Sequence, residues 1–239
     1  MPLVDIVRSA QGMRMEDQDG WVETLEFSPG LSAEEIEELE RSLPCALPQD
    51  VRELLAFSRG FENGPIDICF SGLLDSFGME EIFPSPLVIA RDGFGNYWLI
   101  DLLPGSATWG PIFYVCHDPA VVVFQTSTLE HFISEVLRFA NPPHASEIDD
   151  VHETATMRIW RTNPGAVPAS QLRESADPVL KSFADSLSEA FFIVDLREAS
   201  QGDGFSCGRF GPKTRVVRFG HERVFAYEAK SWWRRVVAL

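Results

Sequence analysis

A hairpin pattern near the middle of the chain constrains its fold more than any other feature. Residues 87–89 are β-formers, and the turn dipeptides Asp92-Gly93 and Gly95-Asn96 follow them. Two further extended runs come next, at residues 97–100 and 111–116. Glycine beside Asp or Asn between two apolar runs is typical of a tight hairpin turn. The pattern therefore predicts three consecutive antiparallel strands.

Two helical patterns precede the hairpin and a third follows it. Ser32 with Glu35 three positions later is a capping box, and Ser127 with Glu130 is another. Pro48 suits the first turn of the helix between them. Apolar residues then recur at helical spacing on one face of each segment: Ile36, Leu39 and Leu43; Val51, Leu54 and Leu55; Leu129, Phe132, Ile133, Val136 and Leu137. The chain is therefore predicted to be an α+β protein.

The order of these motifs resembles the SUKH superfamily, which groups the fungal Smi/Knr cell-wall regulators with many bacterial toxin-immunity proteins. An acidic helix, the Leu47-Pro48 step, a second helix and Gly60 are similar to the opening of that family. The hairpin closing on Asp-Gly-x-Gly-Asn, and a strand that ends in His117-Asp118, resemble its core. The resemblance covers about residues 22–141. It implies a mostly antiparallel twisted sheet with helices packed on it, and a binding protein rather than an enzyme.

The chain divides into four predicted parts. Residues 1–21 are polar without a clear period, and we expect a loosely held N-terminal arm. Residues 22–143 form the SUKH-like domain, and residues 144–154 after the Pro-Pro step read as an acidic linker. Residues 155–239 are expected to form a C-terminal α+β extension, which the family core does not require.

Charge is distributed unevenly along the chain, whose net charge is −16. Residues 1–143 hold 23 acidic residues and seven arginines, whereas residues 144–239 are neutral and residues 205–239 carry a net charge of +6. An acidic surface repels nucleic acid and anionic membranes and attracts a basic partner, although simple solubility is an alternative explanation. The basic C-terminal stretch could dock on the acidic half of the chain or form a separate contact surface.

Two motifs raise the question of chemistry in the C-terminal half. The segment 204–208 matches Gly-x-Ser-x-Gly around Ser206, but the sequence after it cannot start a helix at once, so a tight glycine turn is favoured over a nucleophile. A cluster of possible metal ligands lies in the predicted linker, where a solvated acidic loop is favoured: His144, Asp149, Asp150, His152 and Glu153. We therefore predict no catalytic residue, no metal and no cofactor.

The leading functional hypothesis is an immunity protein that binds a cognate, basic toxin domain, with a nuclease favoured, and blocks its active site. The chain has no apolar run near 18 residues and no signal-peptide pattern at its start, so we expect a cytoplasmic protein. The alternatives are a Smi/Knr-type regulatory scaffold and a hydrolase built on the extension. Phe94 and Trp109 have the hydrophobic core as an equal alternative. The candidate toxin-binding residues are Glu62, Asp67, Asp92, Phe94, Asn96, Asp101 and Trp109.

Overall fold

The computed structural model of the chain describes residues 2–16, 20–64, 66–73, 78–106, 109–207 and 214–229. The helices are α1 (Leu3–Ser9), α2 (Ala33–Ser42), α3 (Gln49–Phe57), α4 (Leu129–Phe139), α5 (Glu147–Asp149), the π-helix η1 (Asp150–Ala155), α6 (Thr156–Thr162), α7 (Ala169–Leu172) and α8 (Pro178–Ser186). The strands are β1 (Arg14–Glu16), β2 (Val22–Thr24), β3 (Glu26–Pro29), β4 (Ser58–Glu62), β5 (Asp67–Cys69), β6 (Pro86–Arg91), β7 (Tyr97–Asp101), β8 (Ile112–His117), β9 (Ala120–Thr126), β10 (Val167–Pro168), β11 (Phe191–Asp195), β12 (Gly204–Ser206), β13 (Val216–Arg218) and β14 (Val224–Glu228). These elements confirm the predicted α+β class.

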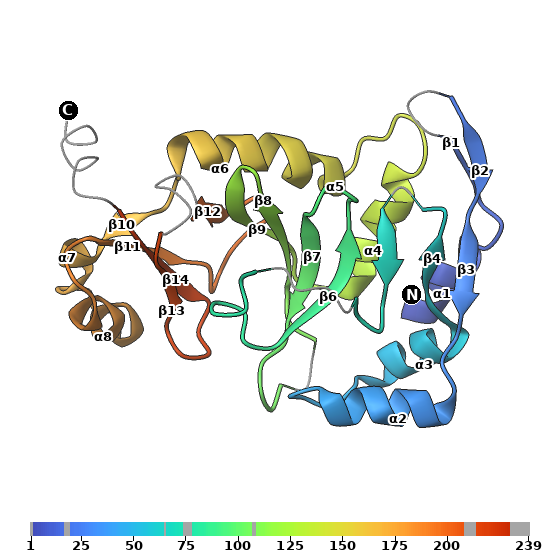
Figure 1. Cartoon of the computed structure of the whole chain (residues 1–239), viewed down its shortest axis with the longest axis horizontal. Helices are drawn as coiled ribbons and strands as arrows, with labels where there is room; N and C mark the ends of the chain where they lie inside the picture. The colour runs from blue at the N-terminus through green and yellow to red at the C-terminus, as the bar shows by residue number, and fades with distance from the viewer. Residues whose placement is uncertain are drawn as a thin grey trace.

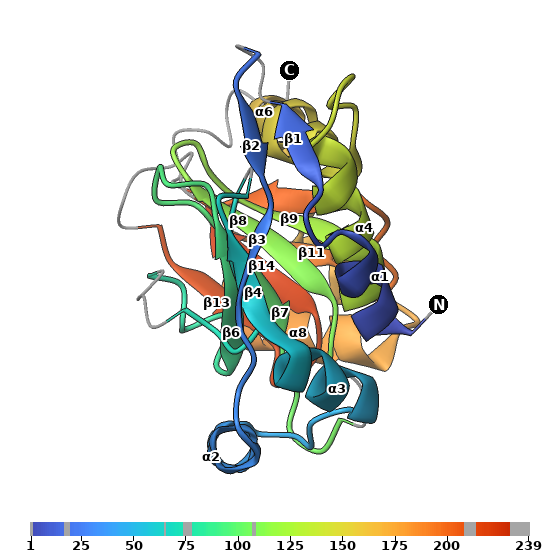
Figure 2. The same ribbon diagram turned by 90° about the vertical axis from the view of Figure 1, so that its right-hand side faces the viewer.

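Within the described residues, the strands form three antiparallel sheets. The largest has eight strands in the order β12-β9-β8-β7-β6-β5-β4-β3, a second has four in the order β10-β11-β14-β13, and β1 pairs with β2. The four-stranded sheet lies beside the large one, and α7 and α8 lie on its far side (Figure 1). Helices α1 and α4 lie on the opposite side of the large sheet (Figure 2). The C-terminal half of the chain therefore adds a second sheet-and-helix unit to the first.

Alternating side chains explain how the large sheet is covered on both faces. Trp98, Ile100 and their neighbours on one face pack against α1, α3 and α4. Leu99 and Phe113, on the other face, pack against Val194 and Phe225 of the second sheet. Successive residues of a strand point to opposite faces, so both halves of each apolar run are buried. Both faces of the strands β6, β7, β8, β9 and β12 are therefore covered by other parts of the protein.

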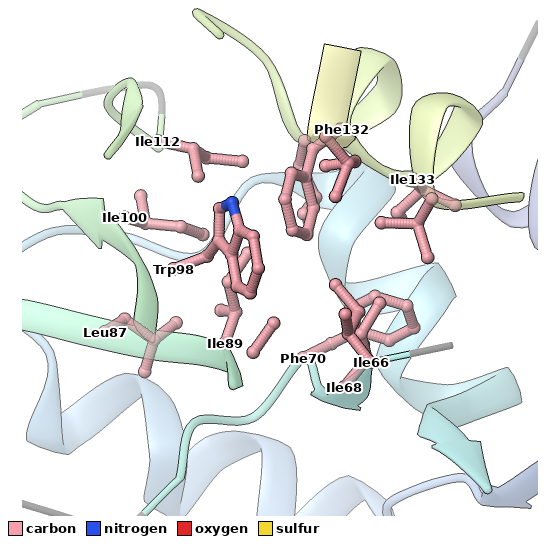
Figure 3. Packing of buried hydrophobic residues seen from close by; sticks show 14 of the residues in the cluster. Ile66, Ile68, Phe70, Leu87, Ile89, Trp98, Ile100, Ile112, Phe132 and Ile133 are labelled. Atoms are coloured by element: carbon pink, nitrogen blue, oxygen red, sulfur yellow. The ribbon is translucent and has the colours of Figure 1, made fainter. Parts of the chain in front are cut away.

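Trp98 lies at the centre of the helix-covered core, where it is completely buried. Phe132 of α4 and Ile100 of β7 lie close to it in Figure 3. Its indole nitrogen donates a hydrogen bond to the side-chain oxygen of Gln125 (3.0 Å), and the Gln125 amide donates to the carbonyl of Glu147 (3.0 Å). This chain of hydrogen bonds satisfies two buried polar side chains and fixes α5 on the sheet.

The structure corrects two of the predicted segments. The expected loose arm contains α1, whose Leu3, Ile6 and Val7 side chains are buried in the main core. The expected acidic linker at residues 144–154 is helical, and Ile148 and Val151 are buried within it. In both segments a few apolar residues at helical spacing pack on the sheet while the acidic ones face outward.

The helix boundaries agree with the predictions with one shift. Ser32 and Glu35 form the predicted capping box at α2, and Asp177 caps α8. At α4 the cap is Thr128, whose hydroxyl accepts a hydrogen bond from the amide of His131, rather than Ser127. Residues 232–237, a further β-like run of the sequence, lie outside the described residues. Within the described residues, no helix is long and apolar enough to cross a membrane.

The Gly-x-Ser-x-Gly segment begins with strand β12 rather than the predicted turn, and this strand joins the large sheet through β9. A Cβ atom on Gly204 would lie 2.0 Å from the carbonyl oxygen of Val122 and 2.9 Å from Cα of Val123. Ser206 is completely buried, and its amide donates to the side chain of Asn163 (2.9 Å). The glycine is therefore needed for the close approach of two backbones.

Gly204→Ala is expected to push β12 away from β9 and to lower the free energy of unfolding by about 1–3 kcal/mol, the usual cost of overpacking a core. Denaturant unfolding monitored by tryptophan fluorescence measures this loss. The matched control is Gly105→Ala, because a Cβ on Gly105 meets no atom within 4 Å although its φ of +72° is also unfavourable for alanine. A Gly204→Ala protein as stable as the wild type would contradict the close packing of β12.

Candidate partner-binding site

One end of the large sheet gathers most of the candidate residues. In an antiparallel sheet, the end of one strand lies beside the start of the next. Glu62 pairs with Glu26, Asp67 with Arg91, and His117 with Ala120 at this end. The turn between β6 and β7 also lies here, because Arg91 pairs with Tyr97. We call this end, with Glu26, Glu62, Asp67, residues 92–96, His117 and Asp118, the hairpin rim.

The turn at residues 92–96 presents Phe94 to solvent, with 79% of its surface exposed. Gly93 and Gly95 have φ angles of +78° and +88°, which other residues rarely adopt, so the two glycines allow the tight loop around Phe94. Aromatic residues are enriched at the centres of protein interfaces, so an exposed phenyl ring on a tight turn is suited to anchor a contact. The alternative that Phe94 belongs to the core is therefore wrong.

Asp92 holds the backbone of this turn. One oxygen of its carboxylate accepts hydrogen bonds from the amides of Phe94 (2.8 Å) and Asn96 (3.2 Å). The other accepts from the Asn96 side-chain amide (2.6 Å) and lies 3.1 Å from Nε2 of His152. Such a network lowers the conformational freedom of the loop before any partner arrives.

Asn96 joins the turn to the neighbouring strand β8. Its side-chain oxygen accepts the backbone amide of His117 (3.1 Å) and lies 2.9 Å from Nδ1 of the same histidine. The amide side of Asn96 is already donating to Asp92, so the oxygen acts as the acceptor for both bonds. Two side chains therefore tie the loop to two other segments of the chain.

The ionisation of Asp92 follows from this environment. Burial raises the pKa of its carboxyl group, but the hydrogen bonds from Asn96, from the amide of Phe94 and from His152 outweigh burial. The pKa of Asp92 is consequently lowered, and the group is a carboxylate at neutral pH. The network that holds the turn is therefore intact across the physiological pH range.

Two of the predicted site residues lie at the opposite end of the sheet. Asp101 ends β7, and Trp109 precedes β8. Asp101 is completely buried and Trp109 is only 8% exposed, so neither side chain is available to a partner. Their placement in the predicted site is wrong because β7 carries them one full strand length away from the turn. Trp109 instead belongs to the hydrophobic core, the alternative that the sequence left open.

Asp101 joins the two halves of the molecule. Its two oxygens accept hydrogen bonds from Nη1 and Nη2 of Arg218 (2.7 and 2.9 Å), and Arg223 adds a third at 3.0 Å. Arg218 also donates to backbone carbonyls of Ile82, His221 and Glu222. The side chains of Asp101 and Arg218 are 1% and 2% exposed. Two basic residues of the C-terminal stretch therefore dock on an acidic residue of the first half, one of the two arrangements that the charge pattern left open.

Acidic side chains surround Phe94 at the rim. Asp67 and Asp118 are exposed, as are Glu26 and Glu62. Arg91, at the end of β6, is a basic residue of this rim, and its Nε lies 2.9 Å from a carboxylate oxygen of Asp67. An exposed aromatic ring within an acidic border is suited to a hydrophobic pocket with basic residues around it.

Both histidines among the possible metal ligands at residues 144–153 have other partners. Nδ1 of His144 lies 2.8 Å from the carbonyl oxygen of Phe139, whereas His152 contacts Asp92. In the part of the chain that the structure describes, no group of three or more His, Cys, Asp or Glu side chains is arranged to hold a metal ion. The two histidines contribute to local structure instead.

Comparison with protein families identifies a segment that contains most of the rim. Residues 30–135 match the model of the SMI1 / KNR4 family (SUKH-1). This segment is therefore recognised as similar to the SUKH superfamily. No curated protein and no solved structure matches the chain.

The SUKH match covers α2, α3, strands β4 to β9 and most of α4. The turn that presents Phe94 lies inside it, whereas α1, β3, η1 and the whole second sheet lie outside. The predicted site residues Asp92, Phe94 and Asn96 lie in this turn, and His117 and His152, which contact it, were not among the predicted site residues. The strand-end position of His117 was readable from its pattern, but the contact of His152 depends on the fold of a segment that we expected to be a linker.

Proposed function

We propose that the protein is a bacterial immunity protein that acts in the cytoplasm, binding a cognate toxin domain and blocking its active site. The SUKH domain supports this class of function, because the family commonly provides toxin-immunity proteins. The observation that carries the proposal is the rigid turn at the hairpin rim, with Phe94 exposed at its tip. A preorganised aromatic anchor is the usual centre of a tight protein interface.

The cover of the sheet supports the rim as the contact surface. From β6 to β12 both sheet faces are buried, one by helices and the other by the second sheet. A partner can therefore reach this part of the sheet only at its strand ends. Among the described residues, the rim carries the exposed Phe94, and the opposite end holds Asp101 in an internal ion pair.

The charge of the protein indicates which toxin it suits. The net charge is −16, and the rim is acidic. A nuclease needs a basic surface to hold phosphates, and an acidic inhibitor can occupy that surface and be steered toward it. A nuclease domain is therefore the favoured target.

The test is an affinity purification of the tagged protein from its native host at moderate salt, with Phe94→Ala as a parallel bait. We expect one small, basic, stoichiometric partner that the wild-type protein retains and the variant loses. Addition of the purified protein to that partner should abolish its toxic activity. Several weak, salt-sensitive partners with no toxic activity would contradict immunity and favour a regulatory scaffold of the Smi/Knr type.

A further inference from the structure

His152 lies outside the SUKH match, yet it contacts the turn that presents Phe94. It belongs to η1, six residues with π-helical hydrogen bonding, in which the Thr156 hydroxyl donates to the carbonyl of Val151 (2.8 Å). π-helical turns are rare and occur often at functional positions. The segment is fixed by Val151, which is completely buried in the main core.

Two aromatic rings set the direction of the His152 ring. It stacks on Trp98, with ring centroids 6.2 Å apart and planes 20° apart, and lies 5.4 Å from the ring of Tyr114. Both rings belong to the buried sheet core. The imidazole is thereby aimed at the carboxylate of Asp92, with Nε2 at 3.1 Å from Oδ2.

The direction of this hydrogen bond follows from the state of Asp92. A carboxylate can only accept, so Nε2 of His152 carries the hydrogen and donates it. The Asp92 side chain is 6% exposed and that of His152 is 35% exposed. Because the acceptor is an ionised carboxylate, this hydrogen bond is charge-assisted, which makes it about twice as strong as one between neutral groups.

We propose that His152 is a positioning residue that holds the Phe94 turn for binding through Asp92. The partner site of the SUKH domain is therefore completed by a residue from the helical segment after it. The inference rests on the proposed function for its biological role, but its structural part concerns the turn alone.

The first test measures amide hydrogen exchange of Phe94 and Asn96 in the free protein by NMR. Their amides donate to Asp92, so their protection reports the turn directly. We expect His152→Ala to lower this protection by about tenfold, in line with loss of a hydrogen bond to a charged group. His152→Gln keeps a donor and should retain most of it. Unchanged protection in His152→Ala would overturn the inference.

The second measurement is the same exchange experiment on a matched control, His131→Ala. This substitution removes a histidine–carboxylate pair with Glu147 (2.7 Å) that does not contact the turn. We expect the protection of Phe94 and Asn96 to stay at the wild-type level in this variant. A loss as large as that in His152→Ala would assign the effect to general loosening of the helical segment and would overturn the role of His152.

Both measurements use the free protein, so they separate this inference from the proposed function. With a purified partner, His152→Ala should also weaken binding by about tenfold and His152→Gln by much less, following the loss of the preorganised turn. If the turn loosens in His152→Ala while the partner affinity stays unchanged, His152 still holds the turn, but its role in binding is overturned.

Discussion

Arg218→Ala is expected to lower the free energy of unfolding by about 3–5 kcal/mol, the usual cost of breaking a buried ion pair. The substitution leaves the carboxylate of Asp101 completely buried, with Arg223 as its remaining base. It also removes the guanidinium group that joins Ile82 of the first half to His221 and Glu222 of the second. Denaturant unfolding measures the loss, and we expect the second sheet to separate from the first at lower denaturant concentration.

The control for Arg218→Ala is a second arginine–aspartate ion pair whose side chains are more exposed to solvent. Arg197 pairs with Asp177 and Asp195 at 2.6 Å each, with side chains 25–35% exposed. Arg197→Ala should cost about 1 kcal/mol or less, because solvent screens exposed pairs. The double variant Asp101→Leu/Arg218→Met should recover part of the lost stability, since it leaves no uncompensated carboxylate. Equal losses for Arg218→Ala and Arg197→Ala would contradict the buried junction.

Phe94→Ala is expected to weaken the complex with the toxin partner by at least about 2 kcal/mol, or roughly 30-fold in Kd. The residue is 79% exposed and fixed at the tip of a hydrogen-bonded turn, so the partner gains a large apolar contact without ordering the loop. The free protein should lose less than about 0.5 kcal/mol of stability, as exposed positions usually do. Isothermal titration calorimetry and thermal unfolding together measure both effects.

A second acidic surface provides the matched control for this substitution. Helix α2 lies at the end of the molecule opposite β1 and β2 (Figure 2), and Glu34, Glu37 and Glu38 are exposed on it. Glu37→Ala and Glu38→Ala should change the affinity by less than about threefold, the effect of a distant charge. A Phe94→Ala protein that binds as tightly as the wild type, with a loss in the α2 variants, would move the interface to α2.

Local chemistry was the part of the site that the sequence could predict. The turn at residues 92–96 depends on glycine φ angles and on an aspartate that accepts nearby amides, and both signals lie within five residues. The helix cap at Ser32 was readable for the same reason. Such short-range patterns need no knowledge of the rest of the fold.

Long-range contacts account for what the sequence did not predict. Asp101 and Arg218 are 117 positions apart, and neither neighbourhood signals the other. The apolar runs 121–124 and 191–194 do carry a signal, because four consecutive apolar residues need cover on both faces of a strand. The acidic segment 145–153 offered just Ala145, Ile148 and Val151 as apolar residues, too few to predict its packing.

Hydrogen–deuterium exchange of the protein with and without its purified partner tests the central claim most directly. The account predicts protection on binding at the hairpin rim, in peptides that cover residues 92–96 and 117–119, with little change in α2. Peptides of η1 should gain protection with the rim, because His152 joins the two. Protection confined to α2 or to the outer helices α7 and α8, with the rim unchanged, would contradict the proposed interface.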